Sequence, residues 1–105
     1  MSDFGLDDSE IRLIRSVLAK QAAIDRAVVY GSRAMGKWKP YSDIDIALFG
    51  EIGWREIGNA KEELEELPLP YKFDVLHYET LKHQGLKDHI DRVGKDLYVR
   101  EKERA

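Results

Sequence analysis

The chain has 105 residues, 43% of them hydrophobic, and its formal net charge is −3 at pH 7. This length suits one compact domain, and this hydrophobic content is too high for a chain that is disordered over most of its length. The acidic balance argues against a nucleic-acid-binding domain, which carries a basic stripe, and the lack of cysteine excludes disulfides and thiolate-bound zinc.

The sequence also has no apolar run of membrane-spanning length, and its acidic N-terminus lacks the apolar segment of a secretory signal peptide. These features predict a cytoplasmic protein. We expect a single domain over residues 1–105, with frayed ends at about 1–7 and 100–105. Pairing of an exposed edge strand would give a homo-oligomer, although nothing in the sequence requires one.

Apolar periodicity defines the first elements. Between residues 10 and 21, apolar side chains recur at 11, 14 and 18 and at 13 and 17, which predicts a core-packing helix with Ser9 as its N-cap. The short β-branched run 27–30 predicts a buried strand. Residues 31–41 are expected to form a loop or short helix, and residues 44–49 a second strand that Gly50 terminates.

The second half of the chain continues this alternation. Residues 51–67 predict a helix, which Pro68 ends. Its six glutamates against two basic residues indicate a solvated helix face, with a docking surface for a basic partner as the functional alternative. Residues 71–77 predict a third strand, residues 81–93 a last helix between Thr80 and Gly94, and residues 95–99 a short final strand.

Two carboxylates stand at the head of the second strand. Asp43 and Asp45 are separated by one residue, so in a strand both side chains point to one face while Ile44 and Ile46 point into the core. Adjacent carboxylates repel one another unless a cation lies between them. Mg²⁺ suits such a pair, because it takes oxygen ligands and leaves positions open for phosphate. The structural alternative is a turn with capping side chains, since Asp and Ser are common in turns.

A possible phosphate-binding turn precedes these carboxylates. Gly31 lets the backbone approach a ligand closely, and a helix start after it offers free N–H groups to a phosphate. The Ser32 hydroxyl can donate a further hydrogen bond, and Arg33, with lysines at 37 and 39, adds positive charge. From the residues alone, the prediction is an anion-binding turn close to a cation-binding pair.

A third carboxylate, Asp74, lies in the middle of the predicted strand 71–77. A charge between Phe73 and Val75 needs a reason, because charges are rarely buried without a partner. Asp74 is therefore a candidate third member of the carboxylate cluster. The alternative is a strand residue that faces solvent.

The histidines and exposed aromatics give weaker signals. His83 and His89 are six positions apart and share no helical face, so we assign them, with His77, to the surface or to packing. Trp38 and two tyrosines, at 41 and 71, are expected to be packing or rim residues, with stacking on an adenine base as the alternative.

The spacing of these motifs resembles a known signature. Gly-Ser at 31–32, ten intervening residues and Asp-Ile-Asp at 43–45 resemble the signature of the DNA polymerase β-like nucleotidyltransferase superfamily. The longer strings 31–36 and 42–46 are similar to those of the minimal nucleotidyltransferases, the MNT proteins. Met35 is a departure, because the family often has a second arginine there. The resemblance implies an α/β fold, with a small mixed sheet of three or four strands and helices packed on one face.

The resemblance also implies an activity: transfer of AMP from ATP to a hydroxyl acceptor by in-line attack on the α-phosphate. Asp43 and Asp45 would ligate the Mg²⁺ that carries the triphosphate. Asp74 would ligate a second Mg²⁺ and activate the acceptor hydroxyl, directly or as general base. The Gly31–Ser32 turn would hold the β- and γ-phosphates, and Arg33 would neutralise charge on the leaving pyrophosphate.

The MNT family further implies a partner, a HEPN-domain RNase toxin whose Tyr hydroxyl receives AMP and whose activity is thereby silenced. Two other classes of function stay open. One is a non-catalytic antitoxin that binds its partner sterically. The other is a small-molecule adenylyltransferase resembling the aminoglycoside nucleotidyltransferases, which needs an acidic pocket; the only dense candidates are Glu62, Glu63, Glu65 and Glu66.

Overall fold

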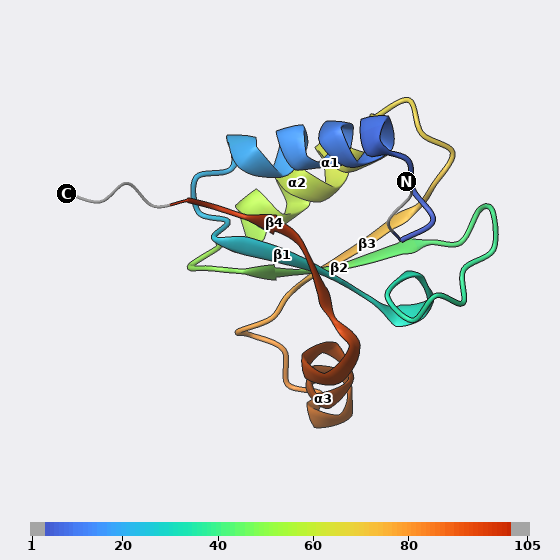
Figure 1. The fold of residues 1–105 in the computed structure, drawn as a ribbon. Helices are drawn as coiled ribbons and strands as arrows, with labels where there is room; N and C mark the ends of the chain where they lie inside the picture. The colour runs from blue at the N-terminus through green and yellow to red at the C-terminus, as the bar shows by residue number, and fades with distance from the viewer. Residues whose placement is uncertain (1–3, 102–105) are drawn as a thin grey trace.

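The computed structural model describes residues 4–101, with three longer helices, one 3₁₀ turn and four strands (Figure 1). In chain order the elements are α1 (Asp8–Lys20), β1 (Arg26–Tyr30), the 3₁₀ turn η1 (Gly31–Arg33), β2 (Ile44–Phe49), α2 (Trp54–Glu65), β3 (Phe73–His77), α3 (Gln84–Val93) and β4 (Lys95–Val99).

The four strands form one mixed sheet, as expected, in the order β3-β2-β1-β4. β1 runs antiparallel to β2 and β4, whereas β2 runs parallel to β3 through the crossover helix α2. The register places Tyr30 opposite Asp45, and Asp45 opposite Asp74. These three residues therefore form one row across three strands, close to the point where β1 ends and β2 begins.

The helices cover both faces of the sheet, and α1 and α2 cover one of them together (Figure 1). They bury the larger core, which includes Ile14, Leu18, Val29, Ile46, Leu48 and Leu64. α3 lies on the opposite face, where Ile90 packs with Val28, Tyr30 and Ala47. The expected layer on one face is thus formed by α1 and α2. α3 differs because its apolar side packs on the residues of β1 and β2 that point away from that layer.

The first helix begins one residue before the predicted cap. Asp7, not Ser9, is the N-cap: its side chain accepts the N–H of Glu10 at 2.8 Å, and the Glu10 carboxylate accepts the N–H of Asp7 at 3.0 Å. This reciprocal pair satisfies two free N–H groups at once, which a cap at Ser9 would not achieve. The Ser9 hydroxyl donates to Asp7 instead, at 2.7 Å.

The other helices are shorter than predicted because their first residues make different contacts. α2 begins at Trp54 with Gly53 as N-cap, and it ends before Pro68. α3 begins at Gln84, where the His83 ring accepts the N–H of Leu86, so Thr80 is not its cap. Gly94 ends α3 as predicted. The strands 27–30, 44–49 and 95–99 are confirmed, with the first extended by one residue.

The ends predicted to fray, at about 1–7 and 100–105, lie partly outside the described residues, which exclude 1–3 and 102–105. Leu6 is completely buried in the main core, in one cluster with Ile11 and Ile14 of α1. Arg100 donates hydrogen bonds to the carbonyls of Ala19, Gln21 and Ile24. Within residues 4–101, no helix has both the length and the apolar character needed to cross a membrane.

Candidate active site

The turn between β1 and η1 lies directly against a carboxylate. Gly31 has φ +73°, a conformation that side-chain-bearing residues rarely adopt. A Cβ atom at this position would collide with Oδ2 of Asp45. Glycine is therefore required twice at this point, by its backbone conformation and by the close approach of the carboxylate.

Two of the three carboxylates predicted from the sequence are neighbours beside this turn. Asp45 and Asp74 are direct neighbours in the parallel β2–β3 pairing, and Asp43 lies two residues before Asp45. Asp45 is partly buried, whereas Asp43 and Asp74 are exposed. Ala47 and Leu76, which pack in the α3 cluster, stand two residues after Asp45 and Asp74. Residues two apart in a strand share a face, so both carboxylates project on the α3 side of the sheet.

The electrostatics of the row show that these charges affect one another. Burial raises the pKa of the Asp45 carboxyl, and negative charge on Asp74 and Asp43 raises it further. The pKa of the buried Tyr30 hydroxyl is raised by burial first and then by Asp45 and Asp74. His89 and Arg33 act on the pKa of Asp45 in the opposite direction but do not cancel the rise. The site is therefore short of positive charge, which a bound cation would supply.

The donor set fits Mg²⁺ that arrives with a triphosphate. Within residues 4–101, no three carboxylate or imidazole side chains converge closely enough to hold a metal ion by themselves. Mg²⁺ is usually bound by one or two carboxylates together with water and substrate phosphates, and seldom by an all-protein cage. A partly buried Asp45 with a raised pKa, next to two exposed carboxylates, matches that kind of incomplete site.

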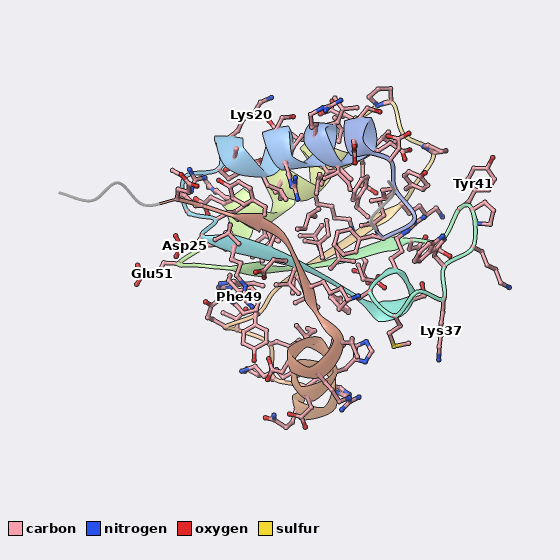
Figure 2. The ribbon with its side chains drawn as sticks, viewed as in Figure 1. Lys20, Asp25, Lys37, Tyr41, Phe49 and Glu51 are labelled. Atoms are coloured by element: carbon pink, nitrogen blue, oxygen red, sulfur yellow. The ribbon has the colours of Figure 1, made fainter. Side chains whose placement is uncertain are left out.

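The backbone carbonyls of the Gly31–Ser32 turn are hydrogen-bonded within the protein, whereas the Ser32 side chain is partly exposed. The carbonyls of Gly31 and Ser32 accept the N–H groups of Met35 and Lys37, at 3.1 and 2.9 Å. Ser32 is partly exposed, and its hydroxyl makes no hydrogen bond to another residue in the described range 4–101. The predicted phosphate contact at Ser32 therefore has a free donor. Lys37 extends outward from the loop after η1 (Figure 2).

Arg33 is placed differently from the expectation that it meets the leaving group. Its side chain is 2% exposed, and its guanidinium donates to the carbonyl oxygens of Ser42 and Phe4. The guanidinium carbon also lies 4.8 Å from the centroid of the Tyr71 ring. The group is thus directed into the protein rather than toward a ligand at the carboxylates.

The aromatic residues near the loop are packing or rim residues, which was the simpler prediction. Tyr71 stacks under Arg33, and its hydroxyl donates to Glu10 at 2.9 Å. Trp38 packs against Gly5. Tyr41 is 73% exposed and points away from the molecule at the tip of the loop (Figure 2).

His89 is a site residue that the sequence interpretation missed. From α3, its Nε2 accepts the N–H of Gly31 at 3.3 Å, and its ring stands edge-on to Tyr30 with 6.2 Å between centroids. Nothing in the local sequence indicates this, because it depends on α3 packing on the carboxylate side of the sheet. His83 and His77 have the expected structural roles, His83 as the α3 cap and His77 in a 2.7 Å hydrogen bond with the Gly50 carbonyl.

We expect His89→Phe to remove the acceptor of the Gly31 N–H while keeping a ring against Tyr30. The amide proton of Gly31 should shift upfield in the NMR spectrum, and the free energy of unfolding should fall by about 0.5–1.5 kcal/mol, the usual net value of one hydrogen bond. His89→Gln, which keeps an acceptor, is the matched control and should change both less. An unchanged Gly31 resonance in the Phe variant would show that the bond is absent in solution.

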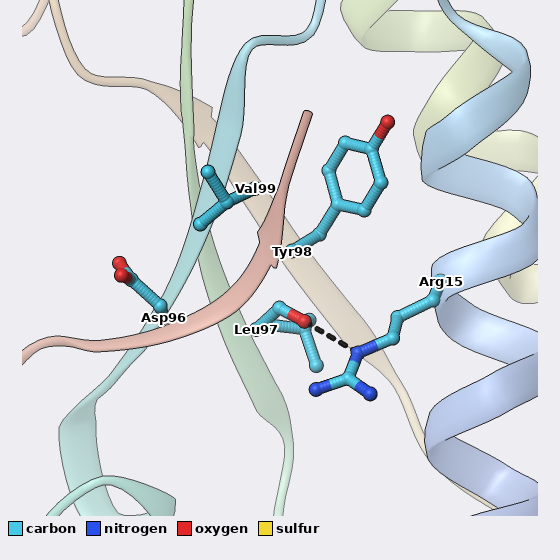
Figure 3. A pocket seen from close by; sticks show the side chains of 5 residues that line it. All are labelled: Arg15, Asp96, Leu97, Tyr98 and Val99. Atoms are coloured by element: carbon cyan, nitrogen blue, oxygen red, sulfur yellow. Dashed lines mark hydrogen bonds between the residues drawn. The ribbon is translucent and has the colours of Figure 1, made fainter. Parts of the chain in front are cut away.

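Two hollows on the molecule lie away from the carboxylates. One, of about 240 Å³, is formed by Arg15 of α1 and the strand β4 (Figure 3). Arg15 crosses it and donates to the Leu97 carbonyl at 2.7 Å. The other, of about 340 Å³, lies between α1 and the end of α2 and includes Glu63 and Glu66. Neither is lined by a residue of the predicted site.

The fold and this arrangement of residues define a class of enzyme. The family model described as polymerase beta, nucleotidyltransferase matches residues 12–103. The chain belongs to this family and is a nucleotidyltransferase, which confirms the resemblance seen in residues 31–46.

Individual proteins similar to this chain include a protein adenylyltransferase and antitoxins of toxin–antitoxin pairs. The Haemophilus influenzae protein named "Probable protein adenylyltransferase MntA" is 27% identical over 102 residues, which cover 95% of this chain and 87% of that protein. A solved toxin–antitoxin structure with AMP-PNP has a TM-score of 0.71 and 19% identity, covering 87% of this chain and 74% of the other. Tri-AMPylated Shewanella oneidensis HEPN toxin in complex with MNT antitoxin gives 0.66 and 17%, covering 88% and 71%. These two structures share the fold.

Proposed function

We propose that this chain is an antitoxin that transfers AMP from ATP to a Tyr hydroxyl of a HEPN-domain partner. The observation that carries the proposal is the row of carboxylates beside the Gly31–Ser32 turn. Such a row has little use in packing, because burial and then negative charge on Asp74 and Asp43 raise the pKa of the Asp45 carboxyl. The names of the H. influenzae relative and of the S. oneidensis complex support protein adenylylation and a HEPN partner.

Each residue of the site has a part in this reaction. Asp43 and Asp45 would hold Mg²⁺, which neutralises charge on the triphosphate and polarises the α-phosphate. The Ser32 hydroxyl would donate to a phosphate oxygen. Asp74 is exposed at the side of Asp45, where it can accept the proton of the incoming hydroxyl as general base. The acceptor oxygen bonds to the α-phosphorus, and pyrophosphate leaves.

Intact mass spectrometry tests this proposal. The protein encoded next to this chain is incubated with the chain, ATP and Mg²⁺, and the control is the double variant Asp43→Ala/Asp45→Ala. We expect mass gains of whole adenylyl units on the partner, absent with the control, and peptide mapping should place them on tyrosine. If both versions form the complex and neither changes the partner's mass, the chain acts as a steric binder.

The small-molecule alternative has less support. It needs an acidic pocket next to the reaction centre, and the glutamates proposed for it belong to the end of α2. α2 packs on the face of the sheet opposite to α3, whereas Asp45 and Asp74 project on the α3 side. A cationic substrate bound at Glu63 and Glu66 would therefore lie on the wrong side of the sheet for these carboxylates.

A further inference from the structure

Arg33 is the one buried charged side chain within residues 4–101. Burial of a guanidinium is costly, and it lowers the pKa of Arg33 despite the opposing effects of Tyr71, Glu10 and Asp43. No carboxylate in the described range lies within ion-pair distance of the guanidinium. Burial of the Arg33 guanidinium without a carboxylate in contact is unfavourable, so we looked for a specific role in its other contacts.

The hydrogen bonds of Arg33 converge on the peptide that introduces the carboxylates. Nε and Nη2 both donate to the Ser42 carbonyl, at 3.1 and 2.8 Å, and Ser42 directly precedes Asp43. Nη1 donates to the Phe4 carbonyl at 2.8 Å. Two donors on one carbonyl fix its direction as well as its distance, which only a planar, forked group can do.

A second set of contacts connects Arg33 to the strand that carries Asp74. The guanidinium stacks on Tyr71, two residues before β3 begins, and the Tyr71 hydroxyl is anchored on Glu10 of α1. Arg33 also follows Ser32 directly in the chain. The Arg33 side chain therefore contacts Ser42, directly before Asp43, and Tyr71, three residues before Asp74. Its backbone is part of the η1 turn.

We propose that Arg33 is a positioning residue that holds the turn, the Ser42–Asp43 peptide and the start of β3 in one arrangement, and that it does not contact the nucleotide. This proposal rests on the proposed function for its catalytic consequence. It replaces the expectation that Arg33 neutralises the leaving group. Placement errors of about 1 Å at a reacting centre can cost 100-fold in rate, so a residue that sets the carboxylates can matter without touching substrate.

The decisive variant is Arg33→Lys, which keeps the charge but loses the fork. At saturating Mg²⁺ we expect kcat to fall about 10–100-fold while the KM for ATP stays within about threefold, and the Mg²⁺ concentration for half-maximal rate to rise. The control is Val17→Ala, a core change in α1 that lowers stability without touching this network. It should leave kcat per folded molecule unchanged.

Two outcomes would overturn the positioning role. A rise of more than tenfold in the KM for ATP with kcat preserved would mean direct phosphate binding. A kcat equal to that of Val17→Ala at the same folded fraction would mean a structural role only. If the Lys variant does not fold, the pair Tyr71→Leu and Tyr71→Phe tests the same role. Leu removes the ring on which Arg33 stacks and should lower kcat several-fold, whereas Phe keeps the ring and should keep kcat.

NMR separates this proposal from the proposed function. The amide resonance of Asp43 reports the orientation of the Ser42–Asp43 peptide whether or not any acceptor is adenylylated. We expect it to shift in Arg33→Lys and not in Val17→Ala. If wild type transfers no AMP but the Asp43 resonance shifts, the proposed function fails and the positioning contact stands. If wild type is active and the resonance is unchanged, the positioning proposal fails alone.

Discussion

Asp45→Asn is expected to give a protein that is more stable and nearly inactive. Loss of a partner that merely orients a metal ligand costs 10–100-fold, so loss of this carboxylate itself should lower AMP transfer by at least about 100-fold. Stability should rise at pH 7 without divalent cations, because the Asp45 charge is disfavoured in the folded chain by burial and by Asp74 and Asp43.

The pH dependence of this effect has a definite sign. The pKa of Asp45 is raised in the folded state above its ordinary value of 3.8. Its contribution to stability is therefore fully present below that ordinary value and is lost as pH rises through the raised folded pKa. Urea unfolding in EDTA should show wild type and Asp45→Asn converging at low pH and diverging at neutral pH, with the variant more stable.

Two further measurements check this result. Asp96→Asn, which removes an exposed carboxylate paired with Arg26 at 3.2 Å, is the control and should lower stability by no more than about 1 kcal/mol. Mg²⁺ with ATP should stabilise wild type and not Asp45→Asn. An Asp45→Asn protein less stable than wild type at neutral pH would contradict the view of Asp45 as a residue under electrostatic strain.

Gly31→Ala is expected to cause the second large effect. Alanine at φ +73° costs about 1–2 kcal/mol for the backbone alone, and the added Cβ would also collide with Asp45. We expect a loss of stability beyond the backbone value and a fall in AMP transfer of roughly 100-fold, because the collision displaces either the turn or the carboxylate.

Gly36→Ala is a close control for this prediction. Gly36 has φ +72°, but a Cβ there would meet only the Trp38 ring, at 4.0 Å. Both variants share the backbone penalty, so the difference between their urea unfolding free energies isolates the clash with Asp45. Equal losses in the two variants, with equal activities, would mean that Gly31 is required for its conformation only.

The sequence was sufficient where a signal is local. The β-branched runs predicted the strands 27–30, 44–49 and 95–99. That Asp43 and Asp45 share one face stays a prediction, because β2 begins at Ile44, after Asp43. Asp74 was singled out because a charge in an apolar strand is rare. The structure leaves its side chain exposed, as the alternative had it, and places Asp74 opposite Asp45 in the β2–β3 pairing. Spacing, residue type and the family resemblance carried this part of the prediction without any knowledge of tertiary packing.

The rest depends on contacts between distant segments. His89 reaches Gly31 only because α3 packs on the carboxylate side of the sheet, and no periodicity in residues 84–93 specifies that side. The direction of the Arg33 side chain depends on the carbonyls of residues 4 and 42, to which its guanidinium donates. These acceptors come from distant segments, so the local sequence does not show that the side chain turns into the protein. The N-cap of α1 was misassigned because Asp7 and Ser9 both suit the position, and only the reciprocal bond with Glu10 decides between them.

The candidate site depends on the parallel pairing of β2 with β3. Asp45 and Asp74 are distant in the sequence and become neighbours only through that pairing, after the chain has crossed over by way of α2. A molecule in which β3 has detached keeps the turn and two carboxylates but loses the third. Detachment of this edge strand would therefore disrupt the candidate site while β2, β1 and β4 stay paired.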